Sequence, residues 1–406
     1  MDPEQTSSAP AAAGPRAASD PIRVGQLGAG FIGKVHSLAY RGAAAAQRRV
    51  GAPIELRTIV DRDEAAAAEA AMQYGWAATG TDWRALVEDP EIDLFDNAGP
   101  NLLHEEPSIA AARAGKHVLC EKPLAASADV AHRIWREVEA AGALHQCAFM
   151  YRFIPALALA RQMVAAGELG EILHFRARFL LSFAVDPDLP MSWRFDHDVA
   201  GAGALGDLGS HHVDLARFLV AEVASVAAAT EVFVPERPGG TVTNDDAFVA
   251  IARLANGATA TFEGSRVAGN HGLTSRVEID GTRGSLAFDF ERLNELTLSE
   301  RGRPGFRTLL ATQAGHPYSD FWLPVGIQGQ HPISWADCFA HQAHCMLSAI
   351  ASGSPLPPEA PTMEDGYRVA EAIDAIAQEA DERAWLDVTY RGLGSQAPVA
   401  DEAGAR

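Results

Sequence analysis

Two polar residues near the middle of the chain have types and a spacing that suit proton transfer. The stretch GALGDLGSHHVDLARFL carries Asp207 and His211 four residues apart, so both side chains lie on one face of the helix expected here. A carboxylate beside an imidazole raises its basicity and fixes its orientation, as taking a proton from an alcohol requires. The alternative is an Asx cap on a glycine-rich turn followed by two incidental histidines, and His212 and Asp214 fit that interpretation better than His211.

Lys122 is a third candidate for chemistry, in the stretch KHVLCEKPL. It follows an expected strand, at the carboxyl end of a parallel sheet, which is where ligands bind in open α/β sheets. A lysine at that edge can donate a hydrogen bond to a substrate oxygen and stabilise the negative charge that develops on it. Pro123 fixes the backbone beside it. A solvated surface lysine is the alternative interpretation.

A glycine-rich stretch near the start of the chain, RVGQLGAGFIGKVH, ends an apolar run and leads into a helical one. Gly28 permits the turn, Gly30 admits a pyrophosphate, and Gly33 lets helix and strand approach, with Phe31 and Ile32 between them. The amides at the start of the helix then face the phosphates. A plain glycine-rich loop is the alternative, and the acid that ends the next strand, Asp61, argues against it.

Asp61 and its neighbour favour different nicotinamide cofactors. The carboxylate of Asp61 can accept both hydroxyls of the adenosine ribose and would repel a 2′-phosphate. Arg62 follows it and can bind that phosphate bidentately. The strand end places Asp61, whereas the arginine can swing into solvent, so we expect NAD and keep NADP as the alternative. Asp61 could also serve as the N-cap of the following helix.

Composition limits the class of protein. The 406 residues suit two domains, and a formal net charge of −20 argues against nucleic-acid and anionic-membrane partners. The chain contains four cysteines, too few for a disulfide framework, so we expect reduced thiols in the cytoplasm. No apolar run approaches the roughly 18 residues that a spanning helix needs.

The elements that must position these residues fall into two parts with different rhythms. Residues 21–150 alternate apolar runs and helical stretches, which predicts an α/β domain with a doubly wound parallel sheet. The expected strands there are 22–28, 54–61, 92–99, 116–123 and 143–150, and the expected helices are 33–47, 62–75, 83–89, 105–115 and 128–142.

Residues 151–390 predict an α+β domain on a large, mainly antiparallel open sheet, because glycine-bearing turns link successive strand-like stretches. The expected strands are 171–183, 222–234, 246–267, 274–290 and 295–300, and the expected helices are 154–170, 207–219, 334–353 and 363–382. Residues 1–20 and 391–406 are expected to be flexible tails.

The segments GAGFIGKVH, GPNLLHEEPSIAAARAGKHVLCEKPL and GAGALGDLGSHHVDLARFL together resemble the glucose–fructose oxidoreductase/inositol dehydrogenase family, also called Gfo/Idh/MocA. The resemblance runs from Ile22 to the final expected helix. It implies a Rossmann domain, a C-terminal sheet domain, a nicotinamide cofactor and polyhydroxylated substrates such as sugars or cyclitols. By this resemblance Lys122 matches the lysine of the family's E-K-P motif, and Asp207 and His211 match its catalytic pair.

The same resemblance supplies further candidates and two departures. It implies cofactor contacts from the loops around Lys122, at Asn97, Pro100, Asn101, His104 and Glu121. The segment SWRFDHDVAGAGALGD resembles the sugar and glycoside dehydrogenase branches and adds Trp193 and Arg194 as substrate contacts, together with Arg152 from MYRFIPA. A packed tryptophan with a surface ion pair is the alternative there. Met150 stands where the family usually has asparagine, and Gly99 where many members have threonine.

One cysteine–histidine cluster, CFAHQAHC, has spacings that can chelate zinc. Its flanking residues describe an ordinary amphipathic helix, in which cysteine acts as a small apolar residue. We therefore expect no metal at these four positions. They are Cys338, His341, His344 and Cys345.

These observations predict an oxidoreductase that transfers a hydride between a nicotinamide cofactor and a secondary alcohol of a sugar, glycoside or cyclitol. His211 would take the proton, helped by Asp207, while Lys122 polarises the oxygen. Two alternatives remain: a dehydrogenase of the same fold acting on a dihydrodiol or imine, and a catalytically silent sensor of sugar or dinucleotide. The family usually pairs its open sheets, which implies a homodimer or homotetramer.

Overall fold

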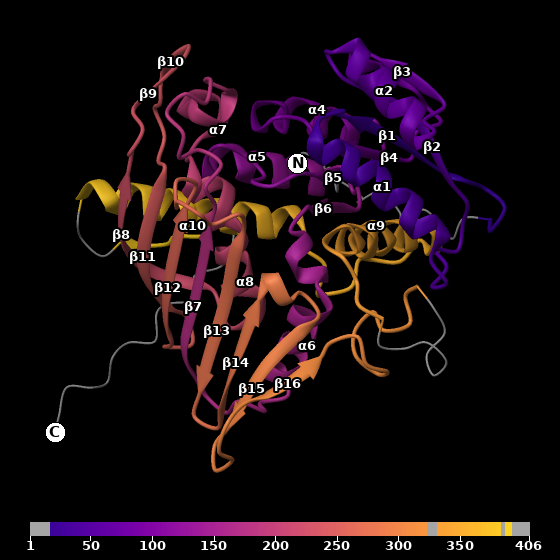
Figure 1. The fold of residues 1–406 in the computed structure, drawn as a ribbon. Helices are drawn as coiled ribbons and strands as arrows, with labels where there is room; N and C mark the ends of the chain where they lie inside the picture. Colours follow the sequence, from indigo (N-terminus) through magenta and orange to yellow (C-terminus); the bar gives the residue numbers. More distant parts are fainter. Residues whose placement is uncertain (1–16, 323–330, 383–385, 392–406) are drawn as a thin grey trace, which may run out of the picture.

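The N-terminal half of the chain forms a six-stranded sheet in which all neighbouring strands are parallel. The strand order is β3-β2-β1-β4-β5-β6, and the sheet lies at the upper right of Figure 1. The order reverses between β1 and β4, the position where such sheets open a crevice for a ligand. The strands are β1 (Ile22–Leu27), β2 (Ile54–Val60), β3 (Ala78–Gly80), β4 (Leu94–Asn97), β5 (His117–Cys120) and β6 (His145–Cys147).

The computed structural model describes residues 17–322, 331–382 and 386–391. The expected tails therefore lie outside the described residues, except for residues 17–20 and Arg391. Helices connect the parallel strands in the expected alternation. They are α1 (Phe31–Ala45), α2 (Glu64–Tyr74), α3 (Arg84–Glu88), the short 3₁₀ helix η1 (Asn101–Leu103), α4 (Glu105–Arg113) and α5 (Ala128–Ala140).

The second sheet has nine strands in the order β16-β15-β14-β13-β7-β12-β11-β8-β17. Only β7 and β12 run parallel within it, so the expected mainly antiparallel sheet is confirmed. Its strands are β7 (Ile172–Leu180), β8 (Val223–Glu231), β11 (Ala247–Leu254), β12 (Thr259–Ser265), β13 (Thr274–Gly281), β14 (Gly284–Asp289), β15 (Glu295–Glu300), β16 (Arg307–Leu310) and β17 (Leu386–Asp387).

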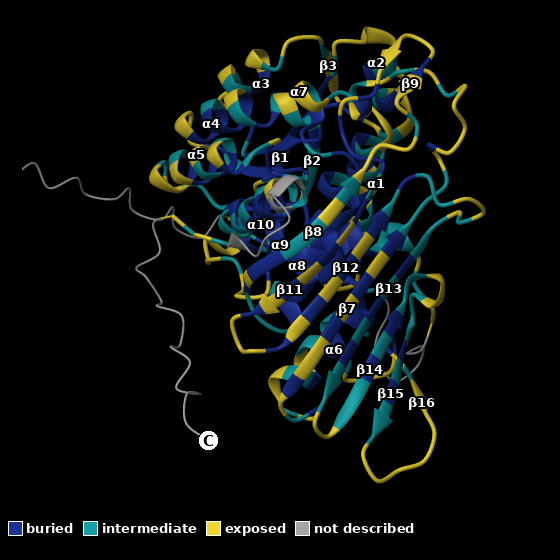
Figure 2. Cartoon of the chain, turned by 90° about the vertical axis from the view of Figure 1, so that its left-hand side faces the viewer, coloured by how far each residue is buried: buried dark blue, intermediate teal, exposed yellow. Residues whose placement is uncertain are grey.

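One face of this sheet is covered by helices and the other is open. The covering helices α6 (Pro155–Ala165), α8 (Ser210–Leu219) and α10 (Met363–Glu382) pack on the strands. Along β7, β11 and β12 buried and exposed residues alternate, and Figure 2 shows the resulting exposed bands. The alternation is expected when one face of a sheet packs on a core and the other does not.

The two halves share one continuous hydrophobic core, which contains residues of both sheets. The helix α9 (Trp335–Ser352) packs along α1, and α10 packs along α5 as well as β8. Both C-terminal helices thus return to the N-terminal sheet (Figure 1). The expected domain boundary between residues 150 and 151 stays a prediction. None of the helices among the described residues is long and apolar enough to cross a membrane.

Several short elements were not expected. They include β3, the β16 and β17 edge strands, and a small two-stranded ribbon of β9 (Glu236–Arg237) and β10 (Gly240–Thr241). Runs of two to four residues are too short to show a period, which explains why the sequence pattern missed them. The expected helix 154–170 ends at Ala165. The first residues of the expected helix 207–219 belong to a π-helical segment, η4 (Leu205–Gly209), and α8 begins at Ser210.

Candidate active site

In the glycine turn between β1 and α1, two glycines are closely packed against backbone atoms and a third is not. A Cβ at Gly28, where φ is +101°, would lie 2.5 Å from the carbonyl oxygen of Ala98, and a Cβ at Gly33 would lie 2.1 Å from that of Gly28. A Cβ at Gly30 would meet no atom within 4 Å. The buried Gln26 fixes the turn by donating to the carbonyls of Gly28 (2.8 Å) and Gly33 (2.9 Å). The turn is therefore held in place by close contacts and hydrogen bonds, and the space beside Gly30 is open.

The start of α1 next to this gap is suited to an anion. Gly30 occupies the N-cap position, so no side chain caps the first amides of the helix, and uncapped N-terminal amides together with the helix dipole bind phosphates well. Phe31 is 72% exposed and stacks on Trp335 of α9, with ring centroids 6.0 Å apart, while Ile32 is partly buried. The residues present thus fit the pyrophosphate of a dinucleotide.

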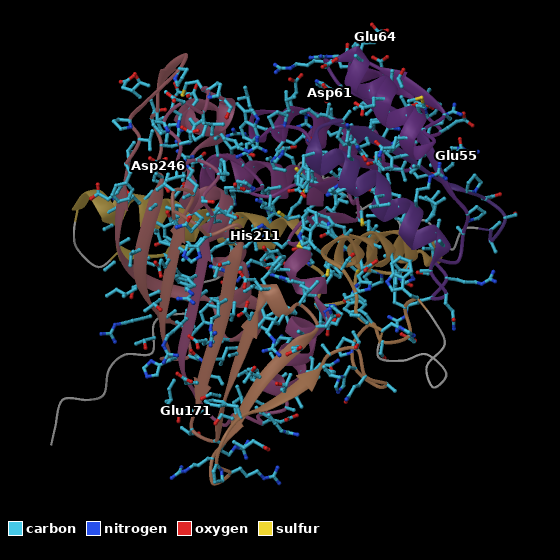
Figure 3. All side chains as sticks on the ribbon, in the orientation of Figure 1. Glu55, Asp61, Glu64, Glu171, His211 and Asp246 are labelled. Carbon is cyan, nitrogen blue, oxygen red and sulfur yellow. The ribbon has the colours of Figure 1, made fainter. Side chains whose placement is uncertain are left out.

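Asp61 stands at the end of β2, beside the glycine turn (labelled in Figure 3). One carboxylate oxygen accepts a hydrogen bond from the amide of Ala29 (2.8 Å) and the other from the amide of Asp63 (3.0 Å). Asp63 caps α2, so the alternative role considered for Asp61 belongs to Asp63 instead. Arg62 between them is exposed. The carboxylate is thus held in place, whereas the guanidinium extends toward solvent.

Lys122 and Asp207 meet across the two halves of the molecule. The ammonium Nζ of Lys122 donates to a carboxylate oxygen of Asp207 at 2.7 Å and to its backbone carbonyl at 3.1 Å. Lys122 follows β5, and Asp207 lies in the π-helical turn η4 that leads into α8. Although surrounding protein disfavours its charged form, Lys122 and nearby cations hold the pKa of Asp207 below its ordinary value. The pair stands at the carboxyl end of the parallel sheet, as predicted.

His211, labelled in Figure 3, lies in the first turn of α8. Aromatic rings surround it. The ring of Tyr151 stacks on it at 4.3 Å with an interplanar angle of 12°, and Phe149 and Phe179 lie at 6.5 and 6.2 Å. His211 is 8% exposed, and its Nδ1 has no hydrogen-bond partner among the described residues. The imidazole therefore sits within contact range of aromatic faces instead of hydrogen-bonding to Asp207.

Asp207 raises the pKa of His211, as expected, but burial outweighs this effect. Burial lowers the pKa of His211 well below its ordinary value, and the charge of Lys122 lowers it further, while Asp207 acts in the opposite direction. Asp207 is paired with Lys122, so its charge offsets only part of the lowering of the His211 pKa. The resulting imidazole is neutral at physiological pH, the form that can accept a proton.

Both halves match known protein families. Residues 22–149 match the model of an oxidoreductase family with an NAD-binding Rossmann fold, and residues 157–287 match the GFO/IDH/MocA C-terminal domain. The chain belongs to the Gfo/Idh/MocA oxidoreductase family. The resemblance and the fold class predicted from the sequence are thereby confirmed, and the N-terminal domain is one that binds NAD.

Relatives within the Gfo/Idh/MocA family cover nearly the whole chain. A levoglucosan dehydrogenase from Pseudarthrobacter phenanthrenivorans is 38% identical over 90% of this chain and 98% of its own length. An inositol 2-dehydrogenase from Rhizobium meliloti is 26% identical over 90% of this chain and 99% of its own. A solved levoglucosan dehydrogenase in complex with NADH and levoglucosan superposes with a TM-score of 0.86 at 38% identity, covering 91% of this chain and 99% of that one.

Two loop residues that were expected to touch the cofactor, Asn97 and His104, contact other parts of the protein with their side chains. Asn97 is fully buried and donates to the carbonyl of Leu103 (2.8 Å) and the hydroxyl of Ser108 (3.0 Å). The ring of His104 is 1% exposed and lies 3.0 Å from the carbonyls of both Pro123 and Gly99. The polar atoms of both side chains hold neighbouring loops together, and their expected contact with the cofactor stays a prediction.

The three other residues expected to contact the cofactor lie in the loops after β4 and β5. Pro100 precedes η1, and Asn101, partly buried, donates to the carbonyl of Ala200 at 2.9 Å. This bond ties the loop after β4 to the segment that leads into the Asp207 turn. Glu121 is 6% exposed and faces His36 instead of solvent. It binds His36 and the backbone amide of Lys122, and its expected contact with the cofactor stays a prediction.

Arg152 was expected to contact substrate, but its guanidinium is paired with two carboxylates, which favours a structural role. Its guanidinium is 6% exposed and binds the carboxylate of Asp214 through two nitrogens, at 2.9 and 2.6 Å, and that of Asp365 at 2.9 Å. These contacts join the short helix η2 (Met150–Phe153) to α8 and α10. Asp214 is therefore a structural partner and not an incidental surface acid.

Trp193 and Arg194 lie at the rim of the site, in the short helix η3 (Trp193–Phe195). The guanidinium carbon of Arg194 stands 4.5 Å from the centre of the Trp193 ring, and the arginine is exposed. Its charge also helps to lower the pKa of Asp207, to a smaller extent than Lys122 does. Asn244 and Arg266 hold the segment by donating to the Arg194 carbonyl at 3.0 and 3.1 Å. Neither of these was foreseen, because no local pattern marks them.

The two departures from the family pattern have simple structural settings. Met150 is 2% exposed and packs in the shared core, and a Cβ at Gly99 would approach the side-chain oxygen of Asn97 at 3.2 Å. The residue next to Met150, Tyr151, is the one that stacks on His211. No sequence pattern marks this tyrosine, because an aromatic residue beside an apolar run is indistinguishable from a core residue.

The cysteine–histidine cluster of α9 packs inside the protein. Cys338 is fully buried, and His341 is 1% exposed, stacks on Tyr318 at 4.3 Å and lies 3.0 Å from the carbonyl of Phe153. Cys345 accepts a weak hydrogen bond from Gln146. Within the described residues, no group of three or more histidine, cysteine, aspartate or glutamate side chains could hold a metal ion.

Proposed function

We propose that the enzyme oxidises a secondary alcohol of a sugar, glycoside or cyclitol with NAD. The observation that carries this proposal is the 2.7 Å contact between Lys122 and Asp207, beside the buried imidazole of His211 and at the sheet edge where the NAD-binding domain takes its ligand. The relatives support the substrate class, since they are named for levoglucosan and inositol. One of them has been solved with both NADH and levoglucosan.

In this proposal the three side chains divide the work of removing a hydride and a proton. NAD, when bound, accepts the hydride from the ring carbon. His211 accepts the hydroxyl proton, and its neutral form is favoured by burial and by Lys122. Lys122 donates a hydrogen bond to the oxygen as it becomes a carbonyl. Asp207 keeps the ammonium aimed at that position through the bond that the two share.

Trp193 and Arg194 would complete the substrate side of this site. An indole face and a guanidinium at the rim suit a ring with several hydroxyl groups, since the first packs on C–H bonds and the second donates to oxygens. On the cofactor side, the glycine turn and the start of α1 would hold the pyrophosphate and Asp61 the ribose. The fixed carboxylate of Asp61 supports NAD over NADP.

The test is a substrate panel monitored by NADH absorbance. Inositols, aldoses, glycosides and 1,6-anhydro sugars are offered with NAD and with NADP, alongside a dihydrodiol and a cyclic amine. We expect turnover with at least one polyol and little with the last two. Turnover confined to the dihydrodiol or the amine would favour the non-sugar dehydrogenase. Tight sugar and NADH binding without turnover would favour the sensor.

We further propose that the enzyme works as a homo-oligomer that buries the open face of the nine-stranded sheet, in a reducing cytoplasmic compartment. That face exposes Val249 (57%) and Ile251 (46%) on β11, one of the strands with exposed bands in Figure 2, and apolar side chains on an uncovered sheet favour pairing. The four cysteines are free, and three of them are buried. Light scattering of the wild type and of Ile251→Asp tests the assembly; a wild-type monomer would refute it.

A further inference from the structure

A cluster of buried polar side chains lies between α1 and the loop that carries Lys122. The Nδ1 atom of His36 is 3.0 Å from both carboxylate oxygens of Asp96, and its Nε2 is 3.1 Å from Oε1 of Glu121. The hydroxyl of Tyr40 donates to Asp96 at 2.9 Å. All four are at most 6% exposed. Three ionisable groups and a phenol are thus enclosed together, away from water.

The contacts define the charge state of this cluster. Asp96 already accepts from Tyr40, and the second oxygen of Glu121 accepts from the backbone amide of Lys122 at 3.0 Å. Each carboxylate is therefore an acceptor, and His36 satisfies both only as an imidazolium with an N–H on each nitrogen. Burial lowers the pKa of His36, but Asp96 and Glu121 outweigh it and raise the value to about 10.

The cluster joins the two binding surfaces of the active site by direct bonds. His36 lies in α1, one turn after Gly33, on the helix whose first amides face the cofactor. It donates to Glu121, which holds the backbone amide of Lys122, and the Lys122 ammonium reaches Asp207. The path from the phosphate-binding helix to the ammonium therefore contains only buried or half-buried hydrogen bonds.

Stability alone is a poor reason for such an arrangement. Buried ion clusters are costly to desolvate, and apolar replacements of similar volume are often neutral or stabilising. A charged side chain that makes a hydrogen bond at each of two atoms has a strongly specified geometry. Such a side chain suits a place where one group must be held in a fixed position relative to another. The ring of His36 is also packed at 5.7 Å from Phe339 of α9, so it has little freedom to turn.

We propose that His36 is a positioning residue: by bridging Asp96 and Glu121 it fixes Lys122 relative to the cofactor-binding helix. The inference rests on the proposed function for its kinetic consequence. The link to Glu121 matters for turnover, whereas the link between Tyr40 and Asp96 on the far side of the cluster serves stability only. This difference separates positioning from a general contribution to folding.

Two variants of His36 each keep one of the two hydrogen-bonding contacts of the ring, to Asp96 or to Glu121, and lose the other. His36→Asn places an amide near Nδ1, so it can keep the bond to Asp96 and loses Glu121. His36→Gln reaches the position of Nε2, so it can keep Glu121 and loses Asp96. Tyr40→Phe is the matched control, since it removes one bond of the cluster on the side away from Lys122.

We expect His36→Asn to lower kcat by about tenfold or more, because a small misplacement of a reacting group costs that much, with NADH affinity within about threefold. His36→Gln and Tyr40→Phe should stay within about threefold of the wild type, although all three lose thermal stability. Equal kcat for His36→Asn and Tyr40→Phe, measured well below the unfolding temperature, would overturn the proposal.

A second readout needs no turnover and uses the lysine content of the chain. The sequence contains three lysines, Lys34, Lys116 and Lys122, so reductive ¹³C-methylation yields few resonances, and Lys122→Ala assigns the relevant one. We expect the Lys122 resonance to move toward that of a solvated lysine in His36→Asn and to stay in Tyr40→Phe. An unchanged resonance in His36→Asn refutes the positioning role. A wild type that turns over no alcohol refutes the proposed function and leaves this resonance test intact.

Discussion

The ammonium of Lys122 and the carboxylate of Asp207 lie 2.7 Å apart although 85 residues separate them in sequence. The bond crosses from the loop after β5 to the π-helical turn before α8. Each partner comes from a different half of the chain, so the site exists only when the two halves are packed together. The single core shared by both sheets supplies that packing.

Lys122→Ala should lower kcat by about 10²-fold or more while NADH affinity changes little, because the group that polarises the substrate oxygen is lost. Steady-state kinetics and NADH fluorescence titration measure the two quantities. The matched control is Lys34→Ala, whose ammonium pairs with Glu69 at the surface and should leave kcat unchanged. Near-normal turnover in Lys122→Ala would remove it from the catalytic assignment.

The pH profile should reflect the buried state of His211. Since burial and Lys122 lower its pKa well below the ordinary value, the imidazole stays neutral, and a base, down to more acidic pH than a solvated histidine. The acid limb of kcat/KM for oxidation, which reports the free enzyme, should therefore lie below the value of about 6.5 that a solvated histidine gives. A limb at 6.5 or above would contradict the burial of this ring as the controlling factor.

Arg152 is expected to affect stability and not substrate affinity. Arg152→Ala leaves the carboxylates of Asp214 and Asp365 with Arg217 alone, whose Nη1 lies 3.9 and 3.1 Å from them. The loss of one partner of a buried ion pair costs at most about 3–5 kcal/mol. Thermal unfolding should show a large drop, with KM for the preferred alcohol unchanged at low temperature. A rise in KM above tenfold without a change in unfolding temperature would restore Arg152 as a substrate contact.

The α9 cluster should bind no metal. Cys338 and His341 are buried, and His341 is engaged by Tyr318 and the Phe153 carbonyl, so a cation would have to displace existing packing. An extensively dialysed sample should contain no stoichiometric zinc, and a chelator should not reduce activity. One tightly held zinc per chain by elemental analysis would overturn this.

The fold could be predicted from the sequence because each buried parallel strand is an apolar run and each connection has a helical period. Gly28, Gly33 and Asp61 could be identified for the same reason: their demands are local, a turn, a close approach and a strand end. Signals of that kind are present in any short window of residues. Elements of two or three residues, such as β9 and β10, give no period and were missed.

The partners of buried charges could not be predicted from local pattern. Arg152 finds Asp214 and Asp365 at separations of 62 and 213 residues, and His36 finds Asp96 and Glu121 at 60 and 85. One compositional signal was overlooked. With only three lysines in 406 residues, an incidental surface lysine at position 122 is an improbable explanation from the start, since arginine supplies nearly all of this protein's cations.

The last prediction concerns the choice between NAD and NADP. Both oxygens of Asp61 accept backbone hydrogen bonds, so the carboxylate cannot leave the position where it would meet the ribose, and it would repel a 2′-phosphate there. Arg62 is exposed, and NAD has no 2′-phosphate for it to bind. Asp61→Ser should therefore weaken NAD use and relieve the exclusion of NADP, while Arg62→Ala should change NAD use little. Comparing kcat/KM for both cofactors in the three proteins decides the matter: a wild-type preference for NADP that disappears in Arg62→Ala would show that the arginine, and not the fixed carboxylate, sets the specificity.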